Sequence, residues 1–132
     1  MKIAVAGVGY VGLVTAVTLA DVGHDVICLD VDKGKLKMLK EGISPIYEYG
    51  LEELMLKNRE RLEFTDDVTK YSEAQVIIIG VGTPEKEDGS ADLSAVFSVA
   101  DSIADNCSDG TVVVVKSTVP IGTCESVRRR IG

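Results

Sequence analysis

The chain of 132 residues has no tryptophan, one histidine, three prolines and three cysteines. Cys28, Cys107 and Cys124 are widely spaced, and no CxxC pair or Cys/His cluster occurs, so neither a disulfide framework nor a metal site is predicted. We therefore expect a reducing, cytoplasmic location. Basic residues are also few: the chain has 14 Lys and Arg residues and 21 Asp and Glu residues. A net charge of -7 argues against nucleic-acid binding, which requires a basic face.

One stretch of the sequence, Ile3 to Ala20, has no charge and resembles a signal peptide or a membrane span. Three glycines interrupt this stretch, and a second apolar run follows soon after it. We therefore interpret it as a buried strand that leads into a buried helix, and we expect no membrane association. The length and the hydrophobic content of 45% predict a single globular domain over residues 1–132.

Short apolar runs alternate with longer helical segments along the whole chain. The predicted strands are 2–6, 25–30, 62–65, 75–81 and 111–116, and the predicted helices are 10–22, 33–40, 51–58, 92–106 and 121–131, with a helical turn at 66–72. The strands are apolar on both faces, which is typical of a parallel sheet covered by helices on both sides. The sequence therefore predicts an α/β fold with a doubly wound, mostly parallel, Rossmann-like sheet.

A GxGxxG motif lies between the first strand and the first helix, and Asp30 ends the second strand 18 residues after Gly12. In such a turn the glycines permit a tight bend, close approach of a pyrophosphate, and close packing of helix on strand. The helix N-terminus favours phosphate, and a carboxylate can accept hydrogen bonds from ribose hydroxyls but repels a 2′-phosphate. The motif predicts NAD as the cofactor; a purely structural glycine turn is the alternative. The residues assigned to the cofactor are Gly7, Val8, Gly9, Tyr10, Val11, Gly12 and Asp30.

Further candidate residues follow later strands. Lys35 lies one turn into the helix after Asp30, where it either covers the adenosine phosphate side or is simply solvated. Ligands of open parallel sheets bind beyond the carboxyl ends of the strands. Two loops leave that edge, and we expect both near the nicotinamide ribose. Their candidate residues are Val81, Gly82, Thr83 and Pro84 in the first loop, and Ser117 and Thr118 in the second.

Four segments, GVGYVGLVTAVTLADVGHDVICLDVD, SPIYEYGLEEL, VGTPEKEDGSADLS and KSTVPIGT, together resemble the UDP-glucose 6-dehydrogenase family over essentially the whole chain. Its members oxidise the C6 alcohol of a nucleotide sugar to a carboxylate with two NAD. The resemblance implies that Gly7–Gly12 hold the pyrophosphate, Asp30 the adenosine ribose, and Val81–Glu85 another side of the cofactor. It implies that Ser117 and Thr118 lie by the nicotinamide, and that Thr118 positions the catalytic water. Tyr49 departs from the proline usual in the family.

A complete family enzyme needs more than these motifs. It has a sixth strand, a long central helix with a lysine and an asparagine, and a cysteine in a glycine-rich motif that forms a covalent intermediate. None of the three cysteines lies in such a motif. We therefore expect the chain to be the NAD-binding part alone, inactive by itself, with the UDP-sugar bound only by a longer enzyme.

Two other functions remain open at this point. A stand-alone NAD-sensing regulatory module would account for the glycine turn and Asp30 but not for KSTVP, VGTP or PIYE. A ligand-free assembly domain would account for the fold alone. In the strand order 3-2-1-4-5-6, a sheet truncated before the sixth strand has 111–116 as its edge. An exposed edge of valines favours association, so we expect a homodimer through this strand.

Overall fold

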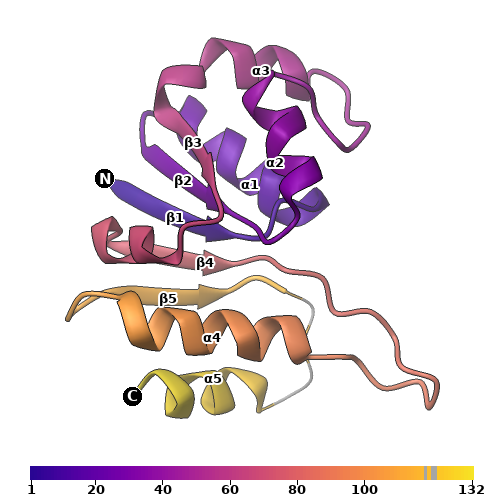
Figure 1. Cartoon of the computed structure of the whole chain (residues 1–132), viewed down its shortest axis with the longest axis vertical. Helices are drawn as coiled ribbons and strands as arrows, with labels where there is room; N and C mark the ends of the chain where they lie inside the picture. Colours follow the sequence, from indigo (N-terminus) through magenta and orange to yellow (C-terminus); the bar gives the residue numbers. More distant parts are fainter. Residues whose placement is uncertain (118, 120–121) are drawn as a thin grey trace.

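The computed structural model describes residues 1–117, 119 and 122–132. They form a five-stranded sheet in the order β3-β2-β1-β4-β5, and every pair of neighbouring strands is parallel. The strands are β1 (Lys2–Ala6), β2 (Asp25–Leu29), β3 (Leu62–Thr65), β4 (Val76–Ile79) and β5 (Val112–Val115). The helices are α1 (Tyr10–Asp21), α2 (Lys33–Lys40), α3 (Leu51–Lys57), α4 (Ser94–Asn106) and α5 (Thr123–Ile131), with short 3-10 helices η1 (Arg59–Arg61) and η2 (Val68–Glu73). The predicted α/β, Rossmann-like class is confirmed (Figure 1).

Two hydrophobic cores lie on opposite faces of the sheet, because successive strand side chains point to opposite sides. On one face Val5, Val26 and Cys28 pack with α1, α3 and Leu39 of α2. On the other face Ile77 and Ile79 pack with η2, α4 and α5, together with Ala4, Ala6, Ile27 and Leu29. Burial raises the pKa of the Cys28 thiol to about 12, so this cysteine is a neutral core residue.

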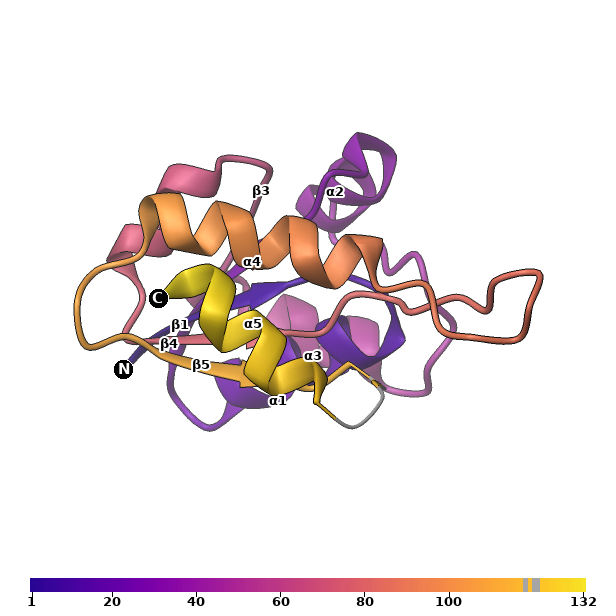
Figure 2. The same cartoon turned by 90° about the horizontal axis from the view of Figure 1, so that it is seen from below.

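The prediction that every strand is covered on both faces is wrong for β5. Val113 and Val115 pack in the core, but Val112 and Val114 are 57% and 40% exposed. Both α4 and α5 belong to the core on one face of the sheet (Figure 2). No helix of the described residues therefore covers the other face of β5. The run of four valines gave no sign of this difference.

Several element ends differ from the predicted ones by one or two residues. β4 begins at Val76 and ends at Ile79, before Gly80, and β5 is shorter by one residue at each end than 111–116. Helix α4 begins at Ser94 rather than at residue 92. The carboxylate of Asp92 accepts the Ser94 N–H at 2.9 Å, so Asp92 stands before the helix.

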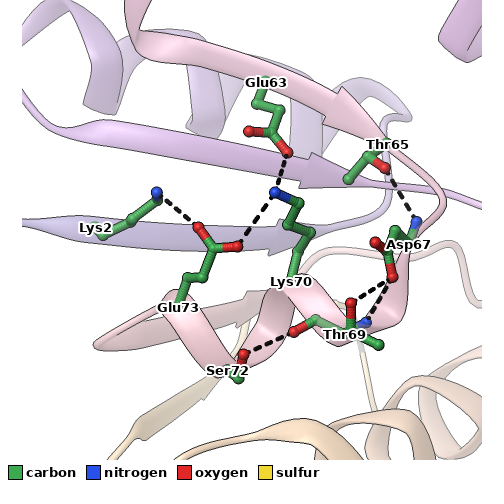
Figure 3. A network of polar contacts seen from close by, with 8 residues as sticks. All are labelled: Lys2, Glu63, Thr65, Asp67, Thr69, Lys70, Ser72 and Glu73. Atoms are coloured by element: carbon green, nitrogen blue, oxygen red, sulfur yellow. Dashed lines mark hydrogen bonds and ion pairs between the residues drawn. The ribbon is translucent and has the colours of Figure 1, made fainter.

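A network of charges joins η2 to the amino ends of two strands (Figure 3). Glu73 pairs with Lys2 of β1 at 2.9 Å and with Lys70 at 3.2 Å, and Lys70 lies 3.6 Å from Glu63 of β3. The two lysines lower the pKa of Glu73, and the two carboxylates raise the pKa of Lys70. At the start of η2, Asp67 accepts the Thr69 N–H at 3.0 Å, which caps the helix.

Among the helices of the described residues, none is long and apolar enough to cross a membrane.

Candidate functional site

One side of the glycine turn is packed against the sheet. Gly7 has a φ of +101°, and a Cβ there would lie 3.0 Å from the carbonyl group of Gly80. A Cβ on Gly12 would lie 1.9 Å from the Gly7 oxygen, and one on Gly80 would lie 3.1 Å from the Gly12 Cα. The start of α1 therefore lies directly against the ends of β1 and β4, an approach that only glycine allows at these positions.

The other side of the turn is open. A Cβ on Gly9 would meet nothing within 4 Å, and Gly9 provides no side-chain cap for α1. The first bond inside the helix runs from the Leu13 N–H to the Gly9 oxygen at 2.9 Å, so the amides of Tyr10 and Val11 have no acceptor within the helix. By contrast, Asp32 caps α2. The start of α1 thus offers free N–H groups and a positive dipole end to an anion.

Asp30 lies immediately after β2, and its carboxylate is fixed against the glycine turn. One oxygen accepts the Val8 N–H and the other accepts the Asp32 N–H, both at 2.9 Å. The Val8 side chain is fully buried, so Val8 acts on the site by positioning Asp30. Each carboxylate oxygen can accept a further hydrogen bond, which leaves Asp30 able to bind ribose hydroxyls.

A pocket of about 150 Å³ lies beside Asp30 and Gly7. Its walls come from the ends of β1 and β2, from η2, and from α4, and they are mostly apolar. They are formed by Ala6, Gly7, Leu29, Asp30, Val31, Asp66, Val68, Tyr71, Val81, Ala95, Ser98, Val99 and Ser102. Burial, with the charge of Asp30 as a second cause, raises the pKa of Tyr71 to about 12. Because its walls are mostly apolar and Asp30 lies at its edge, the pocket is suited to a flat, uncharged ring that is joined to a group bound by Asp30.

The predicted residues of the later loops lie in part at the same edge. Val81 lines the pocket, and the Ser117 hydroxyl donates to the Val81 oxygen at 2.7 Å, which joins the loops after β4 and β5. Gly82 is exposed, and a Cβ there would meet nothing within 4 Å. The Pro84 carbonyl accepts the Asp92 N–H at 2.7 Å and so holds the base of the exposed loop that follows. The hydrogen bond between Ser117 and Val81 therefore holds the two loops together at this edge.

Three further predictions differ in outcome. The Lys35 side chain is half-buried and makes no ion pair within the described residues, so its ammonium is available to a ligand. Thr83 is half-buried in the loop that follows β4. Thr118, assigned to both cofactor and catalysis, lies outside the described residues.

Comparison with known proteins decides the family. The family model described as "UDP-glucose/GDP-mannose dehydrogenase family, NAD binding domain" matches residues 1–132. The chain belongs to the UDP-glucose/GDP-mannose dehydrogenase family. The resemblance inferred from the four motifs is thereby confirmed, as is NAD as the cofactor of this domain.

Similar proteins include other members of this family. A UDP-glucose 6-dehydrogenase of Rhizobium meliloti is 52% identical over 99% of this chain, which spans 31% of that protein. A GDP-mannose dehydrogenase of Pseudomonas aeruginosa, solved as a ternary complex, has a TM-score of 0.92 at 39% identity, and the match covers 99% of this chain and 31% of the other. A UDP-D-ManNAc dehydrogenase of Pyrococcus horikoshii has a TM-score of 0.94 at 33% identity, covering 99% and 32%. The chain therefore spans about a third of the length of these relatives.

Sequence reasoning missed several residues that lie at this candidate site. Gly80 was assigned to the strand, although a glycine that ends an apolar run next to a GxGxxG turn is a usable signal of close packing. Ser98 and Ser102 line the pocket from α4, and their spacing of four residues places them on one helix face. Tyr71 carried no signal, because only the path of η2 brings it to the pocket.

Proposed function

We propose that this chain is the cofactor-binding part of a UDP-glucose 6-dehydrogenase, in which Asp30 selects NAD over NADP. The position of the Asp30 carboxylate is the observation that carries the proposal. It lies 2.9 Å from the Val8 N–H of the glycine turn and at the wall of the pocket. A dinucleotide with its ribose at this carboxylate reaches both the open turn and the pocket.

Each part of NAD then has a partner. The pyrophosphate lies at the free amides of Tyr10 and Val11, where Gly9 leaves room and Gly7 and Gly12 shape the turn. The adenosine ribose binds Asp30, with Lys35 near the phosphates, and the adenine enters the pocket. The nicotinamide half lies by the loops that contain Val81, Gly82, Thr83, Pro84 and Ser117. NAD, when bound, supplies the hydride acceptor; the protein holds and orients it.

Asp30 also accounts for the choice of cofactor. Its two oxygens accept hydrogen bonds from hydroxyl donors, whereas a 2′-phosphate is an anion with no donor to offer at neutral pH. The like charges repel most strongly where no cation neutralises them, and no Lys or Arg lines the pocket beside Asp30. NAD is therefore favoured over NADP.

The reaction of the longer enzyme is the oxidation of UDP-glucose to UDP-glucuronate with two NAD, supported by the name of the 52% identical relative. We assign Thr118 the positioning of the catalytic water and residues 1–132 a single domain. We expect the chain alone to be inactive, and we expect the enzyme to be cytoplasmic.

The cysteines of this chain are poor candidates for the catalytic nucleophile. Cys28 is buried and its thiol has a raised pKa, which is unsuited to a nucleophile. Cys107 directly follows α4 and Cys124 lies in α5, and both are remote from the glycine turn in sequence.

The test is calorimetric titration of the chain and of Asp30→Asn with NAD and with NADP. Asparagine keeps one acceptor oxygen but loses the charge, and hydrogen bonds to charged groups contribute about 1.5–3 kcal/mol. We expect NAD to bind the unchanged chain and the preference for NAD over NADP to fall about tenfold to a hundredfold in the variant. The ratio of the NAD affinity to the NADP affinity is the decisive quantity, because loss of the Val8 contact would weaken the binding of both ligands alike. An unchanged ratio would refute the role of Asp30.

We also propose that two chains associate through β5. This strand ends the sheet on one side, and Val112 and Val114 are exposed beside its unpaired edge. Light scattering over a range of protein concentrations should show a dimer, and Val114→Lys should shift the chain to a monomer because a charge blocks edge pairing. A monomer at millimolar concentration for the unchanged chain would contradict this proposal.

A further inference from the structure

We infer that the Tyr71 hydroxyl is a specificity-determining contact for the adenine base of the dinucleotide. This inference rests on the proposed function, since it takes the pocket beside Asp30 as the place of the base. Tyr71 belongs to η2 and was not among the residues predicted from the sequence. It would make η2, a segment outside the glycine turn, part of cofactor recognition.

Within the part of the chain that the structure describes, the hydroxyl of Tyr71 has no hydrogen-bond partner. The side chain is 2% exposed, yet none of the hydrogen bonds of the described residues involves its oxygen. The single side-chain polar atom among these residues that is both fully enclosed and unpartnered is Nδ1 of His24. The Tyr71 oxygen is therefore not fully enclosed, and Tyr71 is one of the residues that line the pocket.

A hydroxyl that faces mostly apolar walls and has no hydrogen-bond partner in the protein is less favourable than one that has a partner, and phenylalanine would fill the same space without it. Most buried polar groups have a hydrogen-bond partner. The ring of Tyr71 is held by the core that contains Ile77 and Ile79, so packing explains the ring but not the oxygen. A ligand atom in the pocket would supply the missing partner.

The charges at the pocket identify the kind of group that binds there. Its walls include the carboxylates of Asp30 and Asp66 and no lysine, arginine or histidine. A phosphate or a carboxylate of the ligand would be repelled, whereas an uncharged aromatic base would not. The remaining walls are mostly aliphatic and suit the faces of a flat ring, with the hydroxyls of Ser98 and Ser102 as further polar groups.

The Tyr71 hydroxyl is suited to donate to such a base. Because the pKa of Tyr71 is raised to about 12, the group stays protonated throughout the neutral and mildly alkaline range. Ring nitrogens of adenine are hydrogen-bond acceptors. The contact thus joins a neutral donor of the protein to a neutral acceptor of the base, close to the carboxylate that binds the ribose.

The experiment compares Tyr71→Phe with the unchanged chain by calorimetric titration with NAD, ADP-ribose and nicotinamide mononucleotide. We expect NAD and ADP-ribose to bind Tyr71→Phe about three- to tenfold more weakly, the range for one neutral hydrogen bond. Nicotinamide mononucleotide, which lacks adenine, should bind Tyr71→Phe and the unchanged chain with equal affinity. The melting temperature without ligand should stay the same or rise slightly, because the variant keeps the packed ring and removes a hydroxyl that forms no hydrogen bond within the described residues. Tyr49→Phe is the matched control, since that side chain is 97% exposed.

The outcomes separate this inference from the proposed function. If Tyr71→Phe binds NAD as the unchanged chain does while Asp30→Asn still loses its preference for NAD, the inference is overturned and the proposed function stands. A lower melting temperature with equal losses for all three ligands would assign Tyr71 a merely structural role and would also overturn the inference. If the unchanged chain shows no saturable NAD binding, both fail together.

Discussion

At the amino end of the sheet, charged side chains pair with one another, whereas Asp30 and Lys35 at the carboxyl end form no ion pair in the described part of the chain. Lys2 pairs with Glu73, and Lys57 pairs with Asp21 at 3.2 Å. At the carboxyl end Asp30 accepts backbone N–H groups alone, and among the described residues neither Asp30 nor Lys35 forms an ion pair. The difference separates groups that stabilise the fold from groups that are left for a ligand.

The same distinction divides the glycine-rich turn itself. Gly7 and Gly12 face the sheet, where any Cβ would collide with backbone, and Gly9 faces open space. A glycine that is packed on all sides indicates only the fold, since many α/β proteins need the close approach. An open glycine at an uncapped helix start is explained by a ligand instead. The motif therefore contains glycines that the fold requires and a glycine that the ligand requires, and mutation can separate the two.

The largest expected effect is that of Gly12→Ala, with Gly9→Ala as its matched control. A Cβ at Gly12 would lie 1.9 Å from the Gly7 oxygen, so we expect a loss of about 4 kcal/mol or more in the free energy of unfolding, measured with urea. Gly9→Ala should change that free energy by less than about 0.5 kcal/mol. It should weaken NAD binding about tenfold to a hundredfold, because the methyl group occupies the place of the pyrophosphate at about 1–3 kcal/mol. Equal loss of stability in the two variants would contradict the distinction between packed and open glycines.

Much of this site could be predicted from local sequence patterns. The GxGxxG turn and Asp30 are separated by one strand and one helix, and the βαβ connection fixes their relative positions. The strand order followed from the same rules, because right-handed crossovers leave few alternatives for alternating strands and helices. Residues close in sequence, or joined by one crossover, are therefore the ones that sequence reasoning located correctly.

The parts that escaped prediction depend on contacts between distant segments. Tyr71 reaches the pocket because η2 packs against α4 and β1. The other pocket walls include residues of β2 and α4. The exposure of Val112 depends on the course of α5, since a helix on the other face would have buried it. The sequence of β5 is four valines in either case. Local pattern and composition do not contain this information.

The smallest expected effect concerns the paired charges at the amino end. Lys2 and Lys70 hold the pKa of Glu73 below its usual 4.5. Because the pKa of Glu73 is lower in the folded protein than in the unfolded chain, the network contributes its full stability above the unfolded pKa of 4.5. This stability is lost as the pH falls through the pKa of the folded protein. We expect Glu73→Gln to be slightly less stable than the unchanged chain at pH 7, and its stability to fall less steeply between about pH 5 and pH 3. Asp21 and Asp67, whose pKa values are also lowered, preserve part of the slope.

Thermal unfolding followed by circular dichroism over this pH range measures the effect. Glu60→Gln is the matched control, because Glu60 is exposed and forms no ion pair within the described residues. At a salt concentration of 1 M the difference between the two variants should shrink, since the Debye length falls to about 3 Å. NAD affinity should be equal in all three forms. A change in NAD affinity on Glu73→Gln would mean that the amino-end charges also act on the carboxyl-end site, and would remove the distinction between the two ends of the sheet.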